Sequence, residues 1–168
     1  MIETLLRDLR QAEYVHTLLN PLPVYGLALS LLGLIVALFL RSRPAQVTAL
    51  VLILISAASA WPVIHFGEQA KSQVLTLVDG DGRAWLEEHE ERAETLQYFF
   101  FALTAVTAAA IIMPKTWPRM ALPLIVATIV LGVCSLGAGV SIAYAGGKIR
   151  HREFRTGPPP ERADAQLR

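Results

Sequence analysis

Four long stretches of the chain contain no Asp, Glu, Lys or Arg, and this pattern constrains the fold more than any other feature. The stretches cover about residues 22–40, 44–66, 95–113 and 120–147. A helix needs roughly 20 apolar residues to cross the hydrocarbon core of a bilayer, which is about 30 Å thick. Helices that are apolar all round have no polar face to present to water. The pattern therefore predicts an all-α fold, an integral membrane four-helix bundle.

The segments outside these stretches define one transmembrane domain, residues 1–155, and a tail, residues 156–168. Apolar side chains recur at helical spacing in residues 1–19 with charged side chains opposite, which predicts a short N-terminal helix in the membrane interface. The run Asn20-Pro21-Leu22-Pro23 then interrupts the helix. The tail contains three consecutive prolines and charges of both signs, so we expect it to be disordered.

An even number of spans places both termini on the same side of the membrane as the longest connection, residues 66–94. All 14 carboxylates lie on this side, which we call the broad side. By total count the positive-inside rule places the broad side, with 11 of the 15 Lys and Arg residues, in the cytoplasm. By local density it favours a cytoplasmic location for the opposite, narrow side, where two short loops carry only positive charges, and we give this more weight. We therefore expect a multi-pass protein of the bacterial inner membrane with periplasmic termini. The net charge of +1 gives no indication of nucleic-acid binding.

Every histidine of the chain lies on the broad side, near the end of an apolar stretch. Two of them have a carboxylate three residues away, on the same face of a continuous helix. Imidazoles and carboxylates are ligands of zinc, iron and copper, and Glu-x-x-His elements on facing helices recur in di-iron bundles. This chain has only part of the di-iron pattern. The candidate metal ligands are His16, His65, His89, His151, Glu13 and Glu68.

Other interpretations of the same four histidines remain open. They can hold haem b as axial ligands, because small residues in the second and fourth stretches leave room for a flat macrocycle in the same half. They can serve a proton or quinone reaction, or they can be ordinary interfacial residues that form hydrogen bonds. A calcium loop is not indicated: Asp79-Gly80-Asp81-Gly82 has acidic groups at only some of the required positions, so we interpret it as a turn.

Three short motifs stand at the ends of the first, third and fourth stretches. They are His16 with Asn20-Pro21-Leu22-Pro23, then Glu88-His89-Glu90, and then Gly146-Gly147-Lys148-Ile149-Arg150-His151. Over roughly residues 14–155 the chain thereby resembles an uncharacterised bacterial membrane family, domain of unknown function 2231. In that family histidine directly precedes proline in the first motif, whereas here Thr17–Asn20 intervene. Some members are joined to cytochrome c or Rieske-type domains, so the resemblance implies a redox partner.

Taken together, these features predict a small membrane protein that is an accessory to electron transfer. The protein would lie in the lipid bilayer and bind a non-haem transition metal or haem b as its cofactor. Its partner would be a respiratory, cytochrome c or Rieske-type protein. The alternative is a non-catalytic scaffold or assembly subunit without a cofactor. No catalytic motif is present, which argues against an enzyme. No charge lies within any span, which argues against a transporter.

Overall fold

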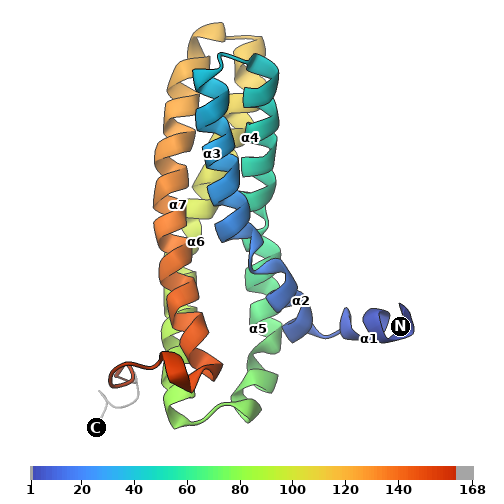
Figure 1. Cartoon of the computed structure of the whole chain (residues 1–168), viewed down its shortest axis with the longest axis vertical. Coiled ribbons are helices and arrows are strands. Elements are labelled where there is room, and N and C mark those ends of the chain that lie inside the picture. Colours follow the sequence, from blue (N-terminus) through green and yellow to red (C-terminus); the bar gives the residue numbers. More distant parts are fainter. Residues whose placement is uncertain (1, 162–168) are drawn as a thin grey trace.

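The computed structural model describes residues 2–161, and within that range the chain consists of helices and connections without a strand. Four helical columns stand side by side in Figure 1. The columns cover Ala12–Phe39, Arg43–Leu77, Gly80–Lys115 and Pro118–Arg150, and each is long and apolar enough to cross a membrane. This confirms the predicted all-α membrane four-helix bundle. Residues 162–168 of the predicted tail lie outside the described residues.

The first column is a series of helices with breaks between them. It consists of α1 Ile2–Asp8, α2 Ala12–Leu19, a π-helical turn Leu22–Gly26 and α3 Leu27–Phe39. Two prolines, Pro21 and Pro23, lack the N–H that a regular helix needs, and the wider π turn accommodates the interruption. The predicted N-terminal helix is split: α1 is exposed along its length, whereas α2 packs against the second column.

The second column also breaks partway along its length. Helix α4, Arg43–Ala58, ends at Ser59, and α5 continues from Ala60 to Leu77. Pro62 has no N–H to offer the carbonyl of Ala58, so the hydrogen-bond ladder is interrupted there. Figure 1 shows that α2 and α5 run side by side below the break and separate from the other two columns.

The third and fourth columns are long helices that pack against each other along most of their length. They are α6 Gly80–Ile112 and α7 Ala121–Arg150; short 3-10 turns, Met113–Lys115 and Pro118–Met120, lie between them, and another, Arg152–Phe154, follows α7. Since α5 ends at Leu77, only two residues connect it to α6. The longest connection, residues 66–94, is therefore largely helical. Most of that segment extends α5 and α6 beyond the apolar stretches, and the Asp79 carboxylate caps α6 by accepting from Gly82 N–H at 2.8 Å.

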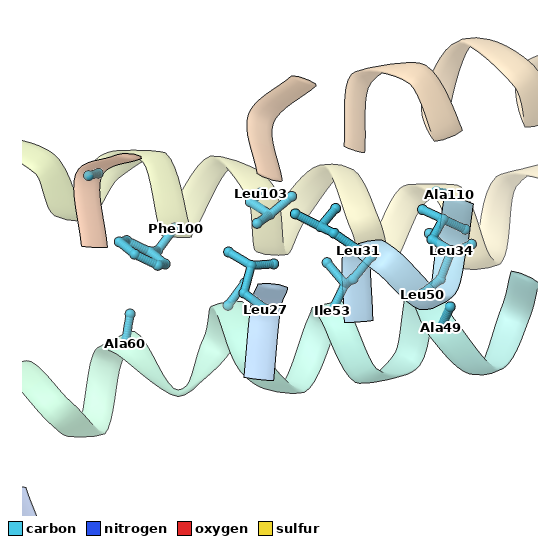
Figure 2. Close-up of a cluster of buried hydrophobic side chains, with 12 residues drawn as sticks. Leu27, Leu31, Leu34, Ala49, Leu50, Ile53, Ala60, Phe100, Leu103 and Ala110 are labelled. Carbon is cyan, nitrogen blue, oxygen red and sulfur yellow. The ribbon is translucent and has the colours of Figure 1, made fainter. Parts of the chain in front are cut away.

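The hydrophobic core fills the half of the bundle next to the narrow side, which we call the narrow half. There α3, α4, α6 and α7 meet. Figure 2 shows Leu27, Leu31, Ile53 and Leu103 pointing toward one another from three of these helices. In the broad half the arrangement differs: α2 packs on α5 and α6 packs on α7, but few residues join these two helix pairs directly.

Two ion pairs link the helix pairs in the broad half. Glu13 on α2 accepts from Arg150 on α7 at 3.1 Å, and Lys71 on α5 donates to Glu90 on α6 at 2.6 Å. All four side chains are partly exposed, so each ion pair contributes little to stability. They do, however, connect α2 with α7 and α5 with α6, and they do so near the level of the histidines.

Candidate functional site

His16 on α2 reaches across to the neighbouring helix α5. Its Nδ1 lies 2.8 Å from the backbone carbonyl oxygen of Val63. Because a carbonyl can only accept, the imidazole must carry its hydrogen on Nδ1. In the neutral ring Nε2 then bears a lone pair, and this is the form in which histidine binds metals.

His89 repeats this arrangement in the other helix pair. It lies on α6, and its Nδ1 is 2.9 Å from the carbonyl oxygen of Ile142 on α7. The same argument fixes the hydrogen on Nδ1 and leaves the lone pair on Nε2. Within residues 2–161 no hydrogen bond is formed to Nε2 of either ring. Each helix pair thus presents one imidazole whose outer nitrogen is available to a ligand.

A glycine stands beside each of these imidazoles, four residues after the carbonyl that the imidazole uses. The side chain at position i+4 of a helix leans back over the carbonyl of residue i, so glycine at that position leaves the carbonyl accessible. A Cβ on Gly67 would lie 3.0 Å from Nδ1 of His16, and a Cβ on Gly146 would lie 3.0 Å from Nδ1 of His89. We call each set of histidine, carbonyl and glycine an imidazole unit.

The two imidazole units lie in the broad half of the bundle, one in each helix pair. They come from the two helix pairs that have few direct contacts with each other, and the ion pairs Glu13–Arg150 and Lys71–Glu90 join those pairs nearby. An imidazole that donates from Nδ1 to a backbone carbonyl is held in the orientation and tautomer of a metal ligand. Each unit therefore holds its own imidazole in the form in which histidine binds a transition metal.

The other two histidines are exposed and interact mainly with residues close in sequence. His65 stacks on Trp61 at 5.7 Å between ring centroids, and its Nε2 accepts from Gln69 at 2.8 Å. His151 stacks on Phe154, and its Nδ1 lies 2.8 Å from a carboxylate oxygen of Glu153.

The two candidate carboxylates are not brought to the imidazoles as a cluster. Glu13 forms its ion pair with Arg150, and Glu68 is exposed on α5. Among residues 2–161 there is no group of three or more His, Cys, Asp or Glu side chains placed to hold a metal ion. Of the six candidate ligands, His16 and His89 are the ones held through Nδ1 by a backbone carbonyl of a neighbouring helix.

The sequence interpretation missed Gly67 and the two carbonyls of Val63 and Ile142. Gly67 lies between His65 and Glu68, and only the histidine and the carboxylate of that motif were considered from the sequence. A usable signal was nevertheless present, since both even-numbered spans carry a glycine near their broad-side end. The carbonyls have no sequence signal, because every residue has one and only the packing of two helices selects which is used.

No protein-family model, curated protein or solved structure matches this chain. The resemblance to the domain of unknown function 2231 family stays a prediction.

Proposed function

We propose that this multi-pass membrane protein carries one redox-active transition-metal centre in its broad half and acts as an accessory to electron transfer. His16 and His89 are its protein ligands. The observation that carries the proposal is the pair of imidazole units: two rings from different helix pairs, each held through Nδ1 by a backbone carbonyl. Outer hydrogen bonds of this kind orient metal-binding histidines and raise their basicity.

The proposal includes a location and a partner. The two short loops on the narrow side are purely cationic, which supports a cytoplasmic narrow side and periplasmic termini in a bacterial inner membrane. The metal centre then lies near the periplasmic surface. The partner would be a respiratory, cytochrome c or Rieske-type protein, as the family resemblance implies, and it would exchange electrons with the centre at this surface.

The test is metal analysis of the purified full chain in detergent, combined with a redox titration. The key variant is His16→Asn with His89→Asn, because an asparagine amide can still donate to the carbonyl but offers no ring nitrogen to a metal. The matched control is His65→Asn with His151→Asn. We expect bound metal in the wild type and in the control, and its loss in the key variant. Metal that remains in the key variant overturns the assignment of ligands.

One observation favours a second candidate, a scaffold or assembly subunit without a cofactor. The hydrogen bonds of His16 and His89 each tie two helices together, which is a structural role in itself. A scaffold predicts a wild-type protein free of metal that still folds when both histidines are replaced by asparagine. The same metal analysis therefore separates the two candidates.

A further inference from the structure

The number of protein donors at the site restricts the kind of metal centre. Zinc sites take three or four protein ligands, and most transition-metal sites take at least three. Here two imidazoles are oriented through Nδ1, one in each helix pair, and within residues 2–161 no group of three or more His, Cys, Asp or Glu side chains is placed to hold a metal ion. A haem iron already has four nitrogen donors from its macrocycle and needs at most two more from the protein. A site with two imidazole donors, one from each helix pair, therefore matches haem better than a bare ion.

The placement of the two imidazoles also matches a flat cofactor. His16 belongs to the pair α2 and α5, and His89 belongs to the pair α6 and α7. Figure 1 shows these pairs as separate columns below α3. A planar group between the pairs would receive one imidazole from each. The glycines of the imidazole units matter here too, since they let each ring lie close against its neighbouring helix.

The two ends of this region differ in polarity. Toward the narrow half, Val24, Phe100 and Gly139 pack tightly: a Cβ on Gly139 would lie 2.9 Å from Cγ2 of Val24. Toward the broad side, the cations of Arg150 and Lys71 stand between the helix pairs, and both are partly exposed. Haem has an apolar edge and an edge with two carboxylates, and carboxylates pair well with Arg and Lys. The region between the helix pairs is likewise apolar toward the narrow half and charged toward the broad side.

From these three observations we infer that the centre is a haem b whose iron is bound by Nε2 of His16 and Nε2 of His89. The inference rests on the proposed function and names its cofactor. A haem iron supplies one-electron chemistry between its ferric and ferrous states. The haem would be held without a thioether bond, because the chain's one cysteine, Cys134, lies well inside the fourth span.

The experiment is a titration of hemin into the purified full chain in detergent, followed by absorption spectra before and after reduction with dithionite. We expect a saturable Soret band and, on reduction, the sharp α band of a six-coordinate low-spin iron. The His16→Asn and His89→Asn variants should each bind hemin at least about 10-fold more weakly or lose the low-spin spectrum. The His65→Asn and His151→Asn variants should match the wild type, and circular dichroism should verify that all variants are helical.

Each outcome decides between the proposals. Bound metal in the wild type without any Soret band, before or after hemin is added, overturns the haem inference and leaves the proposed function standing. A wild type that binds neither metal nor hemin overturns both. A low-spin spectrum that persists when both His16 and His89 are asparagine shows that other residues bind the iron, and this result also overturns the inference.

Discussion

Arg155 donates from Nη1 to both carboxylate oxygens of Asp79, at 2.8 and 3.0 Å, although 76 residues separate the two in the chain. The same guanidinium donates to the carbonyls of Lys148 at 2.8 Å and Ile149 at 2.7 Å. The segment after α7 is thereby fixed to the connection between α5 and α6. We call the contact between Asp79 and Arg155 the terminal clamp.

The first prediction concerns the shape of the arginine in the terminal clamp. Arg155→Met removes every hydrogen bond of the clamp, whereas Arg155→Lys keeps the charge but lacks the planar fork that bonds the carboxylate and two backbone carbonyls at once. We expect a lower melting temperature in detergent for both variants, with the larger decrease for Arg155→Met. Arg152→Met is the control, because that side chain is 77% exposed and should contribute little. Equal effects at the two positions would contradict the clamp.

The second prediction concerns the pH dependence of the terminal clamp. The Gly82 N–H, and after it the Arg155 guanidinium, hold the pKa of Asp79 below its ordinary value of 3.8. A carboxyl whose pKa is lower in the folded chain stabilises the fold above the unfolded value, and this stabilisation is lost as the pH falls through the folded value. Wild type and Asp79→Asn should therefore differ in melting temperature at neutral pH, and the difference should shrink as the pH falls below 3.8. A constant difference over that range would show that the charge of Asp79 is not involved.

The third prediction uses Gly82, where close packing of backbone excludes a side chain. A Cβ at this position would lie 2.6 Å from the carbonyl oxygen of Ile149, and a backbone group cannot turn aside as a flexible side chain can. We expect Gly82→Ala to destabilise the protein by about 1–3 kcal/mol in denaturant or thermal unfolding. Gly137→Ala is the matched control, since nothing lies within 4 Å of its added carbon. The control should be neutral or stabilising by up to about 1 kcal/mol.

The apolar stretches explain why the fold was predictable from the sequence. Nothing but a helix satisfies the backbone of an uncharged run in a bilayer, so four such runs specify a four-helix bundle almost by themselves. The turn at Asp79 was also predictable, because an Asp followed by glycines caps a helix. The charges of the segment 66–94 lie mostly on exposed faces of α5 and α6, so both helices continue beyond the apolar stretches.

The candidate site was predictable only in part, and the reason is geometric. Histidines at the broad-side ends of the four spans lie on one side of the membrane however the helices are arranged. Which of them meet depends on the rotation of each helix and on its packing against its neighbour. His16 and His65 both lie near the broad-side end of an apolar stretch, yet His16 turns to α5 and His65 faces outward. No local pattern distinguishes them.

The fourth prediction tests the glycines of the two imidazole units. Gly67→Ala and Gly146→Ala each place a carbon 3.0 Å from an imidazole nitrogen, so the ring must shift and its bond to the carbonyl must weaken. Disturbing such an outer hydrogen bond typically lowers metal affinity about 10- to 100-fold. We expect losses in this range when metal or hemin binding is titrated. Gly33→Ala and Gly137→Ala, where the added carbon meets nothing within 4 Å, should bind as the wild type does. Equal binding by all four variants would show that the glycines do not position the rings.

The fifth prediction concerns Lys148, which is only 6% exposed. Its ammonium lies 4.3 Å from the ring centroid of Trp85 and 4.1 Å from that of Tyr144, and it donates to the Tyr144 hydroxyl at 2.6 Å. A cation held over an aromatic face away from water gains about 2 kcal/mol. Trp85→Leu should therefore destabilise the wild type more than it destabilises the Lys148→Met background, by about 1–2 kcal/mol in a double-mutant cycle. If the two substitutions are additive within about 0.5 kcal/mol, Trp85 stabilises the fold through its bulk alone and the ammonium depends on Tyr144.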